Sequence, residues 1–230
     1  KIFDFSGAEE NLELARQSVI LLKNEGRLLP IDQTEKIKIA VIGPNAFDLY
    51  SQIGDYSPPL KHGITVSDGM IAYAEQNKNL QIGVSSGYDQ HGNVDAGKIR
   101  DLAFDADVTV LVLGGSSSRF GKANGAAITD GSDIRMDCGE GVDLSSIELP
   151  KDQQQMAAEC YQAANKTVTV VIAGRPYDIS KTAEKTDALL YAFYPGPKGG
   201  RAIAELIFGD ARPSGRLPVS LPKSVGELPV

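Results

Sequence analysis

Short apolar runs and longer stretches with helical spacing alternate along this sequence of 230 residues. Continuous runs of Val, Ile and Leu are typical of strands that are buried on both faces of a sheet. They predict strands over residues 36–43, 80–84, 107–113, 167–172 and 188–193. Apolar positions at helical spacing predict helices over residues 9–23, 67–75, 94–106, 151–165 and 199–208, with Ser67 as the N-cap of the second.

The alternation of strands and helices predicts an α/β fold in which helices cover both faces of a mainly parallel sheet. Five strands are parallel in this arrangement. A sixth, antiparallel strand is expected over residues 216–221, and Pro218 would restrict it to an edge of the sheet. The sequence contains no internal repeat or low-complexity tract, so we predict one domain over residues 1–230.

The carboxyl ends of the strands are where a functional site is expected. Gly43, Gly114 and Gly174 end three of the predicted strands. Ligands of open α/β sheets bind beyond the carboxyl ends of the strands. A tight turn explains each glycine equally well, so these positions mark an edge of the sheet without identifying a site.

A 37-residue segment without a predicted element, residues 114–150, leaves one of these strand ends. Loops of this length are uncommon and often functional. This one carries six carboxylates: Asp130, Asp133, Asp137, Glu140, Asp143 and Glu148. Most of them are expected to be solvated charges or turn formers. Glu140 differs because Gly139 and Gly141 flank it, which places it at a loop tip and allows a ligand to approach the backbone closely.

Composition narrows the possible functions. The chain is 42% hydrophobic with a formal net charge of −7, which disfavours binding to nucleic acid or to an anionic membrane surface. No run of 18 apolar residues is present that could span a membrane. Cys138 and Cys160 make no disulfide framework, and Cys160 falls in a predicted helix where it is expected to belong to the core.

Several common kinds of site are disfavoured by the motifs. The glycine-rich turns match neither GxGxxG nor GxxxxGK[ST], so a nucleotide site is not expected. His62 and His91 are too few and too far apart for a zinc site, and we expect both at the surface. A serine nucleophile would need a GxSxG elbow, which is absent. We therefore predict neither a metal nor a cofactor.

Two long segments resemble glycoside hydrolase family 3. Residues 194–222, YPGPKGGRAIAELIFGDARPSGRLPVSLP, are similar to the signature of its C-terminal domain, and residues 15–30, ARQSVILLKNEGRLLP, are similar to the helix that leads into it. The segments KIAVIGPN at residues 38–45 and GDYS at residues 54–57 also resemble the family. The resemblance extends along nearly the whole chain.

The resemblance implies a three-layer α/β sandwich with a mainly parallel six-stranded sheet, five strands parallel and one antiparallel at an edge. It also implies a (β/α)8-type barrel before residue 1, with residues 1–30 as the helix and linker from that missing domain. A periplasmic or secreted location is favoured over the cytoplasm for the full-length protein. The partners expected are the barrel and a β-glucoside or oligosaccharide substrate, and a homodimer stays open.

The resemblance also gives Glu140 a role. Residues 139–143 (GEGVD) and 148–153 (ELPKDQ) resemble a motif in which the glutamate is the acid/base of a β-glucosidase, while the barrel supplies the nucleophilic aspartate. Leu144 departs from the arginine usual at its position. Side chains expected to contact substrate are Ser116, Ser117, Arg119 and Asp143.

The function expected is therefore one part of a retaining, exo-acting β-glycosidase, most simply a β-glucosidase, and the isolated chain is expected to be inactive. Two alternatives stay open. In the β-N-acetylglucosaminidase branch of the family a barrel residue takes the acid/base role, and this domain would be a non-catalytic scaffold. A flavodoxin-like domain that binds a small ligand is the other.

Overall fold

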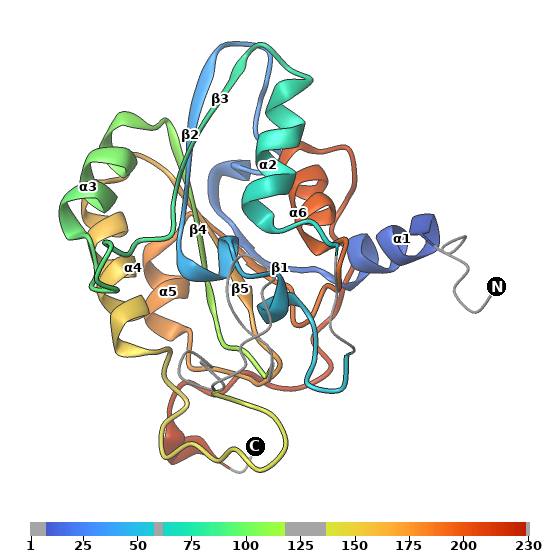
Figure 1. Cartoon of the computed structure of the whole chain (residues 1–230), viewed down its shortest axis with the longest axis vertical. Coiled ribbons are helices and arrows are strands. Elements are labelled where there is room, and N and C mark those ends of the chain that lie inside the picture. Colours follow the sequence, from blue (N-terminus) through green and yellow to red (C-terminus); the bar gives the residue numbers. More distant parts are fainter. Residues whose placement is uncertain (1–7, 58–61, 118–136, 229–230) are drawn as a thin grey trace.

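One six-stranded sheet organises the computed structural model, which describes residues 8–57, 62–117 and 137–228 (Figure 1). The strands are β1 (Ile20–Asn24), β2 (Ile37–Ile42), β3 (Leu80–Ser85), β4 (Val108–Gly114), β5 (Thr167–Ile172) and β6 (Ala188–Tyr191). The helices are α1 (Ala8–Ser18), α2 (Val66–Glu75), α3 (Ala96–Asp105), α4 (Lys151–Ala163), α5 (Ser180–Lys185) and α6 (Gly199–Phe208). Single 3-10 turns occupy Glu25–Arg27, Pro44–Ala46, Leu49–Gln52 and Val225–Glu227.

The strand order is β1-β6-β5-β4-β2-β3. Strands β3, β2, β4, β5 and β6 are parallel, and β1 pairs antiparallel with β6 at the edge. The predicted fold class, with five parallel strands and one antiparallel edge strand between two helical layers, is therefore confirmed.

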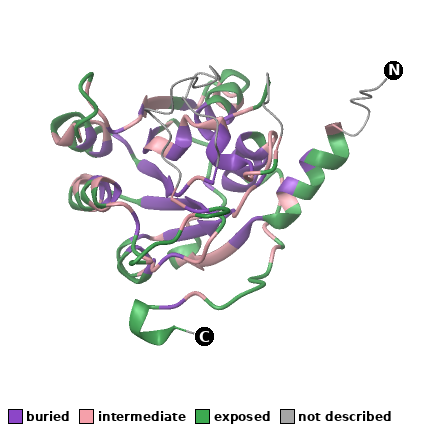
Figure 2. Ribbon diagram, turned by 60° about the horizontal axis from the view of Figure 1, so that its bottom comes forward, coloured by how far each residue is buried: buried purple, intermediate pink, exposed green. Residues whose placement is uncertain are grey.

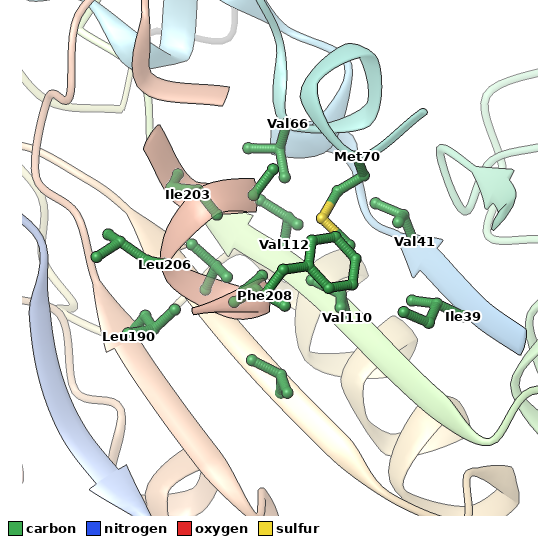
Figure 3. Close-up of a cluster of buried hydrophobic side chains, with 14 of the residues drawn as sticks. Ile39, Val41, Val66, Met70, Val110, Val112, Leu190, Ile203, Leu206 and Phe208 are labelled. Carbon is green, nitrogen blue, oxygen red and sulfur yellow. The ribbon is translucent and has the colours of Figure 1, made fainter. Parts of the chain in front are cut away.

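The two faces of the sheet bury separate apolar clusters because side chains alternate along each strand. In β2, Ile39 and Val41 pack under α2 and α6, whereas Ala40 and Ile42 pack under α3 and α4. Figure 3 shows the first cluster, where Met70 of α2 and several side chains of α6, including Phe208, meet over the central strands. Burial on both faces explains why the strands appear in the sequence as continuous apolar runs. Cys160 belongs to the second cluster, as expected.

The antiparallel edge strand was predicted in the wrong place. The predicted helix over residues 9–23 ends at Ser18, and Ile20–Asn24 forms β1 instead. Ser18 donates its hydroxyl hydrogen to the carbonyl of Ala15, which competes with the helical bonding at that end. The spacing of apolar residues in so short a run does not distinguish a strand from a helix. Here the edge of β6 is available for pairing, and Ile20–Asn24 forms a strand against it.

Residues 216–221 form no strand in the described structure. The edge beside β6 is already occupied by β1, and the prolines at 213, 218 and 222 remove donors that a ladder would need.

Two further expectations, both about helices, need correction. Helix α5, a short polar segment without apolar periodicity, was missed. The N-cap of α2 is Thr65, whose hydroxyl forms a capping box with Asp68, and Ser67 lies inside the helix.

An ion-pair cluster joins α1 to the domain. Figure 2 shows α1 mostly exposed and extending from the body that holds the buried strands. Arg16 of α1 donates from Nε to Glu205 of α6 at 2.6 Å, and Arg201 binds the same carboxylate at 2.8 Å. Burial of Glu205 favours its neutral form, but the hydrogen bonds from both arginines outweigh burial and lower its pKa.

We expect Glu205→Gln to destabilise the chain by about 1–3 kcal/mol at pH 7, because two arginines lose a buried anionic partner. A lowered folded-state pKa stabilises above the ordinary glutamate value of 4.5 and loses that contribution as the pH falls through the folded value. The difference between wild type and variant should therefore shrink toward pH 3, as measured by urea unfolding.

The matched control is Glu13→Gln, which removes an exposed carboxylate 3.2 Å from the same Arg16. It should leave the unfolding midpoint nearly unchanged, since exposed pairs contribute little. If the difference in unfolding free energy between wild type and Glu205→Gln did not change with pH, the stabilising role of the ionised Glu205 carboxylate would be contradicted.

Candidate functional site

The carboxyl ends of β2, β4 and β5 come together because their glycines have no side chains. Gly43 and Gly114 have φ values of 119° and 149°. A Cβ atom on Gly43 would lie 2.1 Å from the carbonyl oxygen of Val112, and one on Gly114 would lie 1.7 Å from that of Ile172. The backbone of each strand end therefore packs against the neighbouring strand, which fixes where the following loops begin.

Helix α4 holds the end of β4 from one side. Gln153 accepts the Gly114 N–H with Oε1 and donates from Nε2 to the Gly114 carbonyl, both at 2.8 Å. Its Nε2 also lies 3.4 Å from Oδ1 of Asn45, which follows β2. The glutamine is buried, so its amide satisfies backbone groups that water cannot reach. This is the glutamine of the ELPKDQ segment.

Asp137 fixes the returning end of the long loop to the residues that follow β4. Its Oδ1 accepts the Ser116 N–H at 2.7 Å, and its Oδ2 accepts the Tyr177 hydroxyl at 2.6 Å. Its own N–H donates to the Ser116 carbonyl at 3.0 Å. Burial and the neighbouring Asp137 carboxylate raise the pKa of Tyr177, so its hydroxyl stays protonated and remains a donor.

The segment after Asp137 is held at two further points. Cys138 places its thiol 3.3 Å from the hydroxyl of Tyr194, and Arg175 donates from Nη2 to the Val142 carbonyl at 3.1 Å. Arg175 is itself restrained, because its carbonyl accepts the buried Tyr191 hydroxyl at 2.6 Å. Residues 138–142 therefore follow a fixed path across the end of the sheet.

Glu140 lies in the turn of this segment and is exposed, between Gly139 with φ 121° and Gly141 with φ 73°. It lines a cleft of about 500 Å³ beyond the strand ends. Polar side chains from several loops share that cleft: Asp55, Tyr56, Ser117, Glu140, Arg175 and Tyr194. Such a cleft can take a polar ligand that offers hydroxyl groups, with one carboxylate placed for proton transfer.

The cleft brings together some of the predicted site residues. Ser117 and Glu140 line it, and Ser117 is buried. Ser116 lies beside Asp137 at an adjacent cavity of about 260 Å³. Asp143 is exposed and is not among the residues that line the cleft. Arg119 lies outside the described residues. The roles of these side chains stay predictions.

Sequence reasoning missed several residues that build the cleft. Asp137 was expected to be a solvated or turn-forming carboxylate, yet it is half-buried and binds Tyr177. Arg175 was not considered, although it directly follows the strand-end glycine at 174. Asp55 and Tyr194 fall within segments that carry the family resemblance, so the motifs gave a signal for them.

Other candidate centres are weaker. Over residues 8–57, 62–117 and 137–228 no group of three His, Cys, Asp or Glu side chains is arranged to hold a metal ion. His62 and His91 are exposed, as expected. A separate hollow of about 460 Å³ between α4 and α5 shares no lining residue with the cleft, and its Glu148 lies 3.7 Å from Lys181. In the part of the chain that is described, every helix is too short or too polar to cross a bilayer.

Comparison with known proteins gives consistent results. The profile described as "Glycosyl hydrolase family 3 C-terminal domain" matches residues 19–230. A β-xylosidase of Formosa agariphila is 31% identical over 95% of this chain and 29% of its own length. A periplasmic β-glucosidase of Salmonella typhimurium is 29% identical over 96% of this chain and 29% of its own length.

A solved structure has the same fold. The β-glucosidase of Listeria innocua in complex with isofagomine matches with a TM-score of 0.77 and 28% identity, over 100% of this chain and 29% of that one. The chain thus spans less than a third of the length of these relatives.

We expect Gly114→Ala to destabilise the chain by about 2–5 kcal/mol, because the new methyl group meets the backbone of β5 and the positive φ becomes strained. Urea unfolding with an unchanged m-value would measure this loss. The matched control is Gly97→Ala in α3, where a Cβ atom would meet nothing closer than 3.7 Å. That variant should be neutral or slightly stabilised, and equal losses in both variants would contradict the packing argument.

Proposed function

This chain belongs to glycosyl hydrolase family 3, and we propose that the longer protein containing it is a retaining, exo-acting β-glycosidase with Glu140 as its general acid/base. In this proposal the chain supplies one carboxyl group of the catalytic pair. A barrel domain that precedes it supplies the nucleophilic aspartate and most of the sugar pocket.

The position of Glu140 is the observation that carries the proposal. A general acid must reach the leaving oxygen within hydrogen-bond distance. Glu140 lines a cleft at the carboxyl edge of the sheet, on a segment anchored before it at Asp137 and after it at Val142. Of the carboxylates in the described part of the long loop, Asp143 and Glu148 do not line this cleft.

The proposed reaction follows from this placement. The barrel aspartate attacks the anomeric carbon while protonated Glu140 gives its proton to the glycosidic oxygen, which leaves as the alcohol. The Glu140 carboxylate then takes a proton from water as that water attacks the glycosyl-enzyme bond. The two carboxyl groups of retaining enzymes lie about 5–5.5 Å apart. The predicted substrate contacts of Ser116, Ser117, Arg119 and Asp143 belong to this proposal.

The sugar we propose is a terminal β-linked glucose residue. β-Xylose is the second candidate, because one relative of 31% identity is named a β-xylosidase and another of 35% identity a probable β-D-xylosidase. The two sugars differ by one hydroxymethyl group, and the barrel is expected to discriminate between them. Comparing kcat/KM for the two p-nitrophenyl glycosides in the full-length enzyme decides which one is preferred.

In the full-length enzyme we expect Glu140→Ala to slow the hydrolysis of cellobiose by about 10²–10⁴-fold. A 2,4-dinitrophenyl β-glucoside should lose far less activity in its first step, because its leaving group needs no proton. Azide should restore turnover and yield a glycosyl azide, since an anionic nucleophile needs no general base.

The matched control is Glu148→Ala, which removes a carboxylate from the same loop outside the cleft and should leave kcat unchanged. Unaltered activity in Glu140→Ala would reject the catalytic role and favour the scaffold alternative, in which the barrel supplies its own acid/base.

The isolated chain of residues 1–230 should hydrolyse no aryl β-glucoside, because half of the proposed catalytic pair is supplied from outside it. A spectrophotometric assay with p-nitrophenyl β-glucoside at high protein concentration measures this. Turnover that copurifies with the chain through two chromatographic steps would contradict the division of the site.

A further inference from the structure

We propose that Tyr177, acting through Asp137, is a positioning residue that sets where the carboxyl group of Glu140 stands at the edge of the sheet. The inference rests on the acid/base role proposed for Glu140. Asp137 and Tyr177 contact the loop backbone and each other.

The Asp137 carboxylate is fixed in orientation because each oxygen has a different donor. Oδ1 accepts from the Ser116 N–H at 2.7 Å and Oδ2 from the Tyr177 hydroxyl at 2.6 Å. Hydrogen bonds to an ionised acceptor are stronger than neutral ones. Glu140 is three residues further along the chain, so the orientation of Asp137 sets the direction in which the turn begins.

The hydrogen bond between Asp137 and Tyr177 occupies the space that Gly115 leaves by having no side chain. A Cβ atom on Gly115 would lie 2.2 Å from the Tyr177 hydroxyl oxygen and 2.5 Å from Oδ1 of Asp137. The hydrogen bond thus crosses directly over a backbone position that has no side chain. The two groups are confined between the backbone and the core, which limits the rotation of the carboxylate.

Tyr177 is a rigid support. Its side chain is fully buried in the cluster under α4. Two residues earlier in the same loop, Arg175 binds the Val142 carbonyl from the other side of Glu140 at 3.1 Å. The segment between β5 and α5 therefore holds the Glu140 turn at both ends, through Tyr177 on one side and Arg175 on the other.

A defined change should follow from removing one hydroxyl group. Tyr177→Phe leaves Oδ2 of Asp137 without its donor, so the carboxylate and the turn after it gain freedom. A misplacement of about 1 Å can cost about 10²-fold in rate. We expect kcat for cellobiose to fall about 10–100-fold with KM nearly unchanged.

The test is a leaving-group series in the full-length enzyme. Aryl β-glycosides of increasing phenol pKa are compared in wild type, Tyr177→Phe and Glu140→Ala. A mispositioned acid should steepen the dependence of rate on leaving-group pKa, in the same direction as Glu140→Ala but less strongly. A general loss of folded enzyme would instead lower the hydrolysis rate of every substrate by the same factor, so the leaving-group dependence would not change.

Tyr161→Phe is the matched control, because it removes the hydroxyl of a partly buried tyrosine, which lies 3.0 Å from Thr169 Oγ1 and does not line the cleft. It should lower the melting temperature without changing the leaving-group dependence. If Tyr177→Phe behaves like Tyr161→Phe while Glu140→Ala gives the steep dependence, the positioning role is rejected and the acid/base role stands. If Glu140→Ala itself gives no such dependence, the proposed function fails first.

A second pair of variants covers the case in which Tyr177→Phe does not fold. Asp137→Asn keeps groups able to bond both Ser116 and Tyr177, whereas Asp137→Ala removes both bonds. The positioning role requires a steep leaving-group dependence in Asp137→Ala and substantial recovery in Asp137→Asn. Equal behaviour of these two variants would overturn it.

Discussion

The backbone of Gly114–Ser116, at the carboxyl end of β4, is the constraint on which the candidate site depends. Three side chains that position the segments around the cleft either bond to these residues or occupy the space left by a missing side chain. Gln153 bonds both polar groups of Gly114, Asp137 bonds both polar groups of Ser116, and the Tyr177 hydroxyl crosses over Gly115. One helix, α4, and two loops are therefore placed by a single short stretch of backbone.

Sequence reasoning predicted the sheet well because burial on both faces leaves a strong pattern. The central strands are continuous apolar runs, and turns punctuate them. It was wrong where the pattern is ambiguous or absent. Ile20–Asn24 continues the apolar run of a helix, and only the free edge of β6 makes it a strand. Helix α5 has no apolar periodicity that could have predicted it.

The candidate site was predictable in part. Loop length and flanking glycines drew attention to Glu140, and the family resemblance supplied its proposed role. Asp137 lies in the same loop, but nothing near it distinguishes it from a solvated carboxylate. Its partner Tyr177 is 40 residues away, and the space above Gly115 exists only once β4 and the loop after β5 are assembled. Long-range pairs of this kind leave no local pattern.

The two glycines around Glu140 and the anchors beyond them have opposite effects. Glycine lets the turn approach a ligand closely, but it also gives the unfolded and folded loop more conformations. A general acid on such a turn would spend time away from the leaving oxygen unless something else fixed its path. The attachments at Asp137 and Val142 do this from residues that belong to the buried core or are bonded to it. The path of a turn that carries an exposed carboxylate can thus be restrained by the backbone attachments on either side of it.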